Sequence, residues 1–567
     1  MGIKEICSYN LTVFTFCLNM RYYLIFLFIS LQLIADAQIW QLDMGLQDQK
    51  RVESLLNDDS VSNQSHIIRF AKNSWGQLFN YKQYKKPSLK MLFVGYGIQH
   101  NNNLPIGFND GNLIPNVGLQ HKASIGAQIN WGPLSIHIQP EWVQAQNLPA
   151  TSFVDDRNEV NYRRNFYWYI RNKIDNGTQI GNQPFQRFYT GQSSVRLNSK
   201  NISLGLSTEN LWWGPGIRNS LLLTNNASGF AHLTFNSIKP IQTKLGTFEF
   251  QAILGNLDST IAPAIDFNNL SPNASFIEPK SKNQRGIAGY YLSWKPRWFK
   301  HLYLGLGGMT YFYRNKPAIE SSANILASEN TQINASLSSV FFRYAIPSEN
   351  AEIYMEYGRN GKFFAPFNII GDTIPTAYIV GFRKLFKLNQ RKLSTDKPAI
   401  MLGVELTQMQ LPDNRLIFNA ADVRGIPRTN SWYTHPYIKQ GYTQQGQVLG
   451  ASIGPGSNSQ TLYLSWVKGL KKIGLSVERI LYNTDFYQYH YFQRGIGNNN
   501  PSNYWVDINA SMQLQWNYKK LLFNVTYLYT SSLNYRWTKL DGDFASPSTL
   551  SDKRNNQINI SLFYLLY

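Results

Sequence analysis

Apolar and polar residues alternate with a period of two along much of this chain. In residues 509–518 every second residue, from Ala510 to Tyr518, is apolar, and the residues between them are Asn, Ser or Gln. Residues 124–131 and, with one exception, residues 523–530 repeat the pattern. Because successive side chains of a β-strand point to opposite faces, the pattern predicts many strands with one apolar and one polar face.

Alternation alone also fits a β-sandwich with one wet face. The polar face here is uniformly Gln, Asn and Ser, and Tyr and Trp stand near the strand ends, as in the aromatic girdles of membrane barrels. Beyond residue 34 no apolar run approaches the roughly 20 residues of a membrane helix. We therefore predict an all-β fold, a transmembrane outer-membrane antiparallel β-barrel over residues 89–567. Its length allows roughly 16 to 20 strands.

The N-terminus carries an export signal. Residues 22–34 form a short apolar run that follows Arg21 and precedes Ala35-Asp36-Ala37. This order is typical of a secretory signal peptide, here residues 1–37, with cleavage after Ala37. A transmembrane anchor is the alternative, but the run is shorter than the roughly 20 residues a helix needs. Met20 is a candidate start codon, which would make residues 1–19 a gene-model extension.

Residues 38–88 lack clean alternation and are expected to form a small N-terminal periplasmic segment, with short helices at residues 51–56 and 67–79. Both cysteines, Cys7 and Cys17, precede the cleavage site. The mature chain therefore has no disulfide, thiolate nucleophile or cysteine metal site. The sequence has no metal-ligand cluster and no nucleotide-binding glycine motif, so we expect no metal and no cofactor.

Polar insertions rich in Gly and Asn mark the loops, and the Gly132-Pro133 pair is expected to be a short turn. The expected loops are residues 100–122, 151–190, 262–285, 321–334, 413–447 and 494–503. The last strand, residues 558–567, ends on Tyr567, a terminal aromatic residue of the kind that the barrel assembly machinery reads. Longer loops of such barrels face outside and short turns face the periplasm.

Phasing the strands by their apolar faces sends a set of carboxylates into the lumen. They are Glu141, Glu209, Glu249, Glu352, Glu356 and Glu405. Inward placement is expected because charge on the lipid face is destabilising. Such carboxylates could do general acid–base work on a glycosidic bond. The other interpretation is that they pair with inward arginines, and nothing in the sequence brings two of them together. We expect no catalytic residue.

Residues 209–235 hold the most distinctive run of the chain. Trp212 and Trp213 precede a Gly-Pro-Gly turn, Arg218 follows it, and then comes the pair Asn225 and Asn226. Indole faces offer stacking surface, while Asn and Arg offer hydrogen bonds. This combination suits a sugar, which has an apolar C–H face and a rim of hydroxyls.

Two histidines stand beside aromatic residues and complete the candidate glycan-binding set. One is His232. The other, His435, lies near Arg428, Trp432 and Tyr433 and could line a sugar groove. Two lone histidines in separate segments are more often structural than catalytic or metal-binding.

The formal net charge of +20 indicates a polyanionic partner. The charges of residues 1–37 cancel, so the mature chain keeps the whole excess. Nucleic acid is excluded, because an exported barrel does not meet it and no recognition motif is present. Lipopolysaccharide phosphates and acidic exopolysaccharide are the candidates, and outer-leaflet lipid phosphates alone could also explain the excess.

Several phrases of the sequence resemble the capsule assembly proteins of the Wzi type, outer-membrane barrels of Gram-negative bacteria. They are WWGPG and its surroundings, GPLSIHIQPEWVQAQN at residues 132–147, HLTFNSIKPI at 232–241, AEIYMEYGRNGKF at 351–363 and SWYTHPYIKQGYTQQGQVLGASIGPGSN at 431–458. The resemblance implies eighteen strands, helical periplasmic material before the barrel, and location in the cell outer membrane. It also implies binding of capsular or other extracellular polysaccharide during capsule assembly.

Two other functions remain open at this point. A porin-like channel for sugars or ions would use the same barrel with an open lumen. An outer-membrane hydrolase is disfavoured, because the lipase-type Gly-x-Ser-x-Gly motif is absent and no Ser–His pair is suggested by spacing. We expect a binding protein and not an enzyme.

Overall fold

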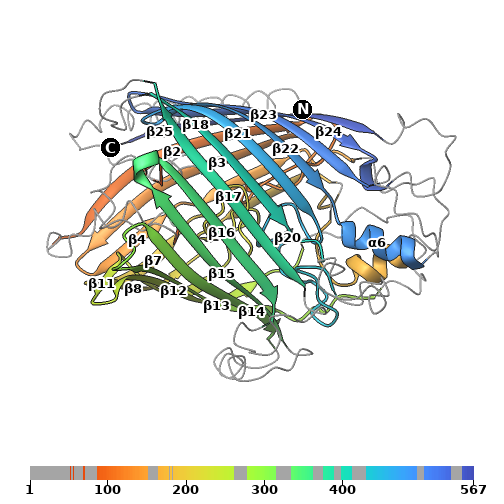
Figure 1. The fold of residues 1–567 in the computed structure, drawn as a ribbon, viewed down its shortest axis with the longest axis horizontal. Coiled ribbons are helices and arrows are strands. Elements are labelled where there is room, and N and C mark those ends of the chain that lie inside the picture. Colours follow the sequence, from red (N-terminus) through yellow and green to blue (C-terminus); the bar gives the residue numbers. More distant parts are fainter. Residues whose placement is uncertain are drawn as a thin grey trace, which may run out of the picture. The chain divides into compact units, whose positions relative to one another are not determined.

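A closed antiparallel barrel accounts for most of the computed structural model (Figure 1). The structure describes residues 51–52, 55, 68–69, 86–150, 164–177, 179–181, 183–260, 278–314, 334–361, 375–388, 398–411, 430–493, 504–537 and 552–566. Within these residues, 21 strand segments form the closed sheet. Three strands are interrupted into two segments each (β4 and β5, β6 and β7, β10 and β11), so the barrel has 18 strands, the number that the family resemblance implies.

The barrel segments, in chain order, are β2 (Ser88–Asn101), β3 (Gly118–Trp131), β4 (Leu134–Ile138), β5 (Glu141–Ala145), β6 (Phe185–Tyr189), β7 (Ser194–Ser199), β8 (Ile202–Ser207), β10 (His232–Ser237), β11 (Ile241–Thr243), β12 (Gly246–Leu257), β13 (Arg285–Pro296), β14 (Leu302–Tyr313), β15 (Asn334–Ile346), β16 (Ala351–Asn360), β17 (Thr376–Lys387), β18 (Ala399–Gln408), β21 (Asn458–Lys468), β22 (Lys471–Leu481), β23 (Val506–Tyr518), β24 (Leu521–Leu533) and β25 (Lys553–Leu565). The other elements are the two-residue strands β1 (Ile68–Arg69), β9 (Trp212–Trp213), β19 (Thr443–Gln444) and β20 (Gln447–Val448), and the helical segments η3 (Tyr167–Arg171), η5 (Pro347–Glu349), α6 (Thr484–Gln493) and η8 (Tyr535–Trp537).

The barrel closes where its first strand meets its last. β2 pairs antiparallel with β25, with Phe93 opposite Leu565 and Asn101 opposite Gln557. β2 also pairs with β3 on its other side, so its backbone groups are shared between two ladders. Closure leaves the sheet without an unpaired edge, which a barrel in hydrocarbon requires.

The alternation along the strands separates an apolar outer face from a polar inner face. On β22, Leu475 and Val477 are exposed, whereas Glu478 is buried. β23 follows the same rule, with Met512 exposed and Asn509 buried. The outer face is therefore the one that suits lipid, and the inner face holds the polar groups.

The two ends of the barrel differ in the length of their connections. Short turns at one end include Gly132-Pro133, as expected, and Lys519-Lys520. The longer connections, among them residues 102–117, 208–231 and 430–457, lie at the other end. We call these the short-turn end and the long-loop end. By the usual rule for such barrels, they face the periplasm and the outside, respectively.

Helix α6 lies at the long-loop end, beside η3 (Figure 1). Tyr169 of η3 stacks on Tyr489 of α6 with ring centroids 4.6 Å apart, and Phe166 meets Phe486 edge to face at 5.2 Å. None of the helices in the described part of the chain is both long enough and apolar enough to span a membrane.

Two of the long connections fold into the barrel and fill it. Residues 208–231 and 430–457, which we call the lumenal segments, contribute fully buried side chains such as Leu221, Leu222, Trp432 and Tyr442. These join inward residues of the strands in one large hydrophobic cluster. The lumen is therefore packed with protein along these segments.

A short piece of the N-terminal region also lies inside. Arg51, Val52 and Leu55 are helical and buried, and the last two pack against Leu385 and Met401 of β17 and β18. The expected helix at residues 67–79 is wrong where the structure describes it, because Ile68–Arg69 form β1 and pair with Trp212–Trp213 of β9. The expected signal peptide, the possible start at Met20, both cysteines, most of residues 38–85 and the terminal Tyr567 lie outside the described residues.

Candidate functional site

The Gly-Pro-Gly turn of the first lumenal segment is held by the carboxylate of Glu405 on β18. The backbone N–H groups of Ile217 and Asn219 donate to its two oxygens at 2.6 and 2.8 Å, and the N–H of Arg218 donates at 3.1 Å. The hydroxyl of Tyr354 donates to the same carboxylate at 2.7 Å. An ionised carboxylate that accepts several backbone N–H groups is a strong anchor, so Glu405 fixes the turn inside the barrel.

Glu356 on β16 anchors the same segment at the next two residues, Ser220 and Leu221. Its Oε2 accepts the N–H of Leu221 at 3.2 Å and the hydroxyl of Ser220 at 3.4 Å. Gly214 has φ of 140°, and a Cβ there would lie 2.6 Å from Glu356 Oε2. Glycine is thus required at position 214 both by backbone conformation and by the close approach of the carboxylate.

Arg218 forms the most extensive set of polar contacts in the segment. Its Nε and Nη2 donate to the two oxygens of Glu478 at 2.8 and 3.0 Å, and its Nη1 donates to Ser452 at 2.9 Å. Its guanidinium also lies 4.6 Å from the ring centre of Phe108. Burial alone would lower the pKa of Arg218, but the Glu478 carboxylate raises it, so the side chain is a permanent cation.

Trp212 and Trp213 are fully buried. The Nε1 of Trp213 donates to Gln251 at 2.8 Å, and its ring stacks on Tyr291 with centroids 5.3 Å apart. The faces of the two indoles are covered by protein in this structure, where they help to fill the lumen.

The second lumenal segment is bound to the first through Tyr433. Its hydroxyl donates to the carbonyl of Leu221 at 2.7 Å and accepts the N–H of Ala451 at 2.8 Å. Trp432 beside it is fully buried. His435 accepts the N–H of Ile438 at 3.0 Å on Nδ1, which closes a tight turn. Burial lowers the pKa of His435 to about 4, so the ring is neutral at pH 7.

The other four inward glutamates are also buried and hydrogen-bonded. Glu141 accepts from Asn112 at 2.9 Å, Glu209 pairs with Arg196 at 2.5 Å, and Glu249 accepts from Ser293 at 3.4 Å. Glu352 lies between Arg51, Arg343 and Arg383, with N–O distances of 2.9, 2.6 and 2.7 Å. All six carboxylates therefore have partners that fit a structural role in the lumen.

Three more residues of the expected glycan set lie near the long-loop end. Asn225 accepts the N–H of Gly111 on its carbonyl at 2.7 Å, and Asn226 donates its side-chain amide to Val448 at 2.9 Å. His232 is buried at the start of β10 and bonds through Nδ1 to the carbonyl of Phe230 at 2.8 Å. Arg428 lies outside the described residues.

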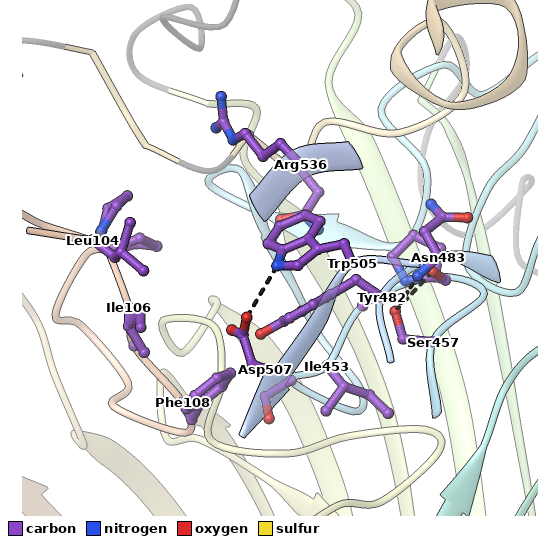
Figure 2. A pocket seen from close by; sticks show the side chains of 18 of the residues that line it. Leu104, Ile106, Phe108, Ile453, Ser457, Tyr482, Asn483, Trp505, Asp507 and Arg536 are labelled. Atoms are coloured by element: carbon purple, nitrogen blue, oxygen red, sulfur yellow. Dashed lines mark hydrogen bonds between the residues drawn. The ribbon is translucent and has the colours of Figure 1, made fainter. Parts of the chain in front are cut away.

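A cavity of about 200 Å³ opens at the long-loop end between connections far apart in sequence. In Figure 2, Leu104, Ile106 and Phe108 line one side, and Tyr482, Trp505 and Asp507 lie opposite them. We call this the aromatic cavity.

Trp505 is the centre of the aromatic wall. Its ring stacks on Tyr482 with centroids 4.2 Å apart and meets Tyr535 and Trp537 at 5.2 Å each, close to perpendicular. Its Nε1 donates to Asp507 at 3.0 Å (Figure 2). A half-buried ring fixed on several sides is a rigid surface, and the adjacent Asp507 and Asn483 supply polar atoms to the same cavity.

The backbone beside this wall is strained. Asn534, Arg536 and Trp537 all have positive φ, at 48°, 54° and 52°. Asn adopts this conformation readily, whereas Arg536 and Trp537 each cost roughly 1–2 kcal/mol relative to right-handed conformations, and strain of this kind gathers at functional sites. The three residues of η8 form part of the rim of the aromatic cavity.

Of the residues singled out from the sequence, Asn226 lines the aromatic cavity. Arg218 does not line it but contacts two residues that do, Phe108 and Ser452. The wall residues Tyr482, Trp505 and Tyr535 were not predicted. A usable signal was present, since Trp505 lies two residues after an expected loop and η8 lies near the start of another connection. Among the described residues no group of His, Cys, Asp and Glu could hold a metal ion.

The profile of the capsule assembly protein Wzi family matches residues 108–520. The chain belongs to this family. A solved structure with the same fold is the Escherichia coli outer-membrane protein Wzi, described as a carbohydrate-binding β-barrel involved in group 1 capsule assembly. It is 13% identical with a TM-score of 0.55, covering 93% of this chain and 99% of that chain. This Wzi-family barrel is therefore an outer-membrane protein.

More distant structures are also similar to this Wzi-family chain. OccAB2 of Acinetobacter baumannii has a TM-score of 0.40 at 9% identity, covering 85% of this chain and 98% of that chain. A BenF-like porin from Pseudomonas fluorescens has a TM-score of 0.38 at 7% identity, covering 85% and 99%. A comparison with curated protein sequences gives no match.

Proposed function

We propose that this barrel binds a capsular or other extracellular polysaccharide at its long-loop end and helps to attach or assemble it at the cell surface. It acts by binding, without turnover. The aromatic cavity is the observation that carries the proposal, because it combines rigid ring surface with polar groups at the end that faces outside. Sugars need this combination, one apolar face for stacking and hydrogen-bonding partners for the hydroxyls.

Family membership supports the same function. The E. coli relative is described as carbohydrate-binding and involved in capsule assembly, and the family is named for capsule assembly. For this chain we propose that the polysaccharide contacts the barrel around Trp505, Tyr482 and Tyr535.

The packed lumen favours binding over conduction. The lumenal segments are anchored to the strands by Glu356, Glu405 and Glu478, and their aromatic side chains are fully buried between the barrel walls. A porin-like function needs a water-filled path, which a lumen filled in this way disfavours.

Further partners follow from charge and location. The formal net charge of +20 favours contact with lipopolysaccharide phosphates and with acidic polysaccharide. The apolar outer face requires outer-membrane lipid, and insertion of a closed barrel into that membrane makes the barrel assembly machinery a further partner.

The test is deletion of the gene, followed by measurement of cell-bound and shed polysaccharide. Cells complemented with the wild-type gene are expected to retain the polysaccharide, and cells with Trp505→Ala to shed it. Trp298→Ala, at an exposed position of the short-turn end, is the matched control and should retain it. Unchanged retention in the deletion strain, together with reduced sugar uptake, would favour the channel instead.

A further inference from the structure

One tryptophan at the long-loop end keeps a large exposed surface. Trp168 of η3 is 45% exposed. The other exposed tryptophans among the described residues, Trp131 and Trp298, lie at the short-turn end, where an indole suits the interface between lipid and water. Trp168 belongs to a helical connection and not to a strand of the barrel wall. Its ring is therefore a surface on which a sugar can stack at the end that faces outside.

The helical segment that carries Trp168 also carries cations at helical spacing. The chain is α-helical just before η3, and η3 continues it as π-helix, a form found often at functional sites. The guanidinium of Arg164 lies 5.2 Å from the ring centre of Trp168, and the ammonium of Lys173 lies 5.5 Å from that of Tyr169. Arg171 stands in the last turn, about 10 Å along the helix from Arg164. We call Arg164, Arg171 and Lys173 the η3 cations.

The carboxylates near this segment are already matched by other cations. Asp175 pairs with Lys280 at 3.2 Å, and Glu278 pairs with Lys439 at 2.9 Å. Among the residues that the structure describes, no carboxylate lies within ion-pair distance of an η3 cation, and the charge of Glu278 acts on Lys173 from further away. The η3 cations are partly buried, so their side chains are already ordered. Such a local excess of positive charge concentrates anions.

A second exposed ring lies beside the same segment. Tyr437 of the second lumenal segment is 50% exposed, and its N–H donates to Nδ1 of His435 at 3.3 Å. The N–H of His435 donates in turn to the carbonyl of Lys173 at 2.9 Å, which joins this turn to the helical segment. Phe166 and Ile170 of the same helix line the aromatic cavity. One polymer bound in the aromatic cavity can therefore extend across the η3 cations.

We propose that this face of η3 binds an acidic stretch of the polysaccharide, with its carboxylates paired to the η3 cations and a sugar ring stacked on Trp168. Binding here rests on the proposed function and deepens it, since it assigns acidic sugars to the polymer. A guanidinium holds a carboxylate through two parallel hydrogen bonds, which are the strong contacts, whereas stacking on the indole does not depend on charge. Cations spread along a helix suit repeated carboxylates better than a single small anion.

The test uses the purified surface polysaccharide of the bacterium that carries this gene, and the same polysaccharide with its carboxyl groups chemically reduced to alcohols. Binding of each polymer to the detergent-solubilised full chain is measured by biolayer interferometry. The native polymer is expected to bind about ten-fold or more tightly than the reduced polymer, as follows from the loss of charge-assisted contacts. Equal binding of the two polymers by the wild type would overturn the proposal without the need for any variant.

Substitutions separate the two kinds of contact. Arg164→Gln combined with Arg171→Gln should weaken binding of the native polymer about ten-fold or more and leave binding of the reduced polymer unchanged. Trp168→Ala should weaken binding of both polymers, by about three- to ten-fold, because stacking is independent of charge. Arg554→Gln, at an exposed cation of the long-loop end of β25, and Trp298→Ala are the matched controls and should bind like the wild type.

The charge-conserving pair Arg164→Lys with Arg171→Lys should retain most of the binding. The electrophoretic mobility of the folded barrel checks that each variant is folded. An equal loss in the Lys and Gln variants, or unchanged affinity in the Gln variant, would contradict the assigned role of the η3 cations. No binding of either polymer by the wild type would overturn the proposed function as well, whereas a failure confined to the variants or to the reduced polymer leaves the proposed function standing.

Discussion

Arg218 of the first lumenal segment forms a two-pronged ion pair with Glu478 of β22, with N–O distances of 2.8 and 3.0 Å. The two residues are 260 positions apart in sequence. Their side chains are 16% and 8% exposed, so the pair is largely withdrawn from water. It ties the inward segment to the wall of the barrel.

Removing one partner of this pair should destabilise the barrel strongly. Arg218→Ala leaves the Glu478 carboxylate buried without its cation, which costs about 3–5 kcal/mol. The double variant Arg218→Met with Glu478→Gln should recover a large part of that loss, because no buried charge remains. The measurement is the temperature at which the detergent-solubilised barrel changes from the electrophoretic mobility of the folded form to that of the unfolded form. Equal losses in the single and double variants would mean that the pair itself contributes little.

The anchoring of the turn by Glu405 should control whether the lumen conducts. Glu405→Gln replaces one acceptor oxygen by an N–H₂ group that faces backbone N–H donors, and a buried donor without an acceptor costs about 1–3 kcal/mol. The first lumenal segment should then detach more often from the inner wall of the barrel. In planar bilayers the wild type is expected to conduct little, and the variant to show frequent openings. Leu406→Val, at the adjacent outward position, is the control and should behave like the wild type.

A stable, large conductance of the wild-type barrel would contradict this expectation. It would show that the lumenal segments leave a continuous water-filled path, and the channel function would then be favoured.

Asp485 of α6 should make stability depend on pH. Burial raises the pKa of its carboxyl from 3.8 to about 6, while the Leu411 N–H and the Ser431 hydroxyl donate to it at 2.9 and 2.8 Å. Between about pH 4 and pH 6 the folded chain binds more protons than the unfolded chain, so stability falls as the pH rises through this window. The full cost, about 3 kcal/mol, is present above the folded-state pKa.

The check is the difference in melting temperature between the wild type and Asp485→Asn across pH 4 to 7. Other titrating groups cancel in this difference. The wild type should lose stability relative to the variant as the pH rises. Parallel curves would show that Asp485 titrates normally.

The depth of a residue on the outer face should set the effect of a charge placed there. Leu475 lies near the middle of β22 and is exposed, so Leu475→Arg should cost about 2–4 kcal/mol in lipid. Tyr518→Arg, at the last residue of β23, should cost about 0–1 kcal/mol near the interface. Refolding into liposomes at graded urea measures both. Equal costs at the two sites would indicate that lipid does not surround the barrel.

The barrel could be predicted from the sequence because hydrocarbon outside and polar groups inside impose a period of two on every strand. The position of the Gly132-Pro133 turn followed from the same pattern. The interruptions within strands could not be predicted from the pattern, because the residues at a break such as that between β4 and β5 have the same composition as the strand around them. Residues 208–231 have no clear period, so their path into the lumen could not be foreseen.

The site was harder to predict for a related reason. Trp212 and Trp213 are conspicuous in sequence, yet aromatic composition does not reveal whether a ring faces solvent or protein. The aromatic cavity joins Phe108 of the β2–β3 connection to Tyr482 and Trp505, which lie at the two ends of the β22–β23 connection, and only the closed barrel brings them together. Its partial signal was the position of Trp505 at the edge of a polar loop.

The pairing of β2 with β25 has a consequence for biogenesis. The seam cannot form until the final strand has been delivered, whereas the lumenal segments belong to the middle of the chain. Both lumenal segments are therefore synthesised before β25, the strand that closes the barrel.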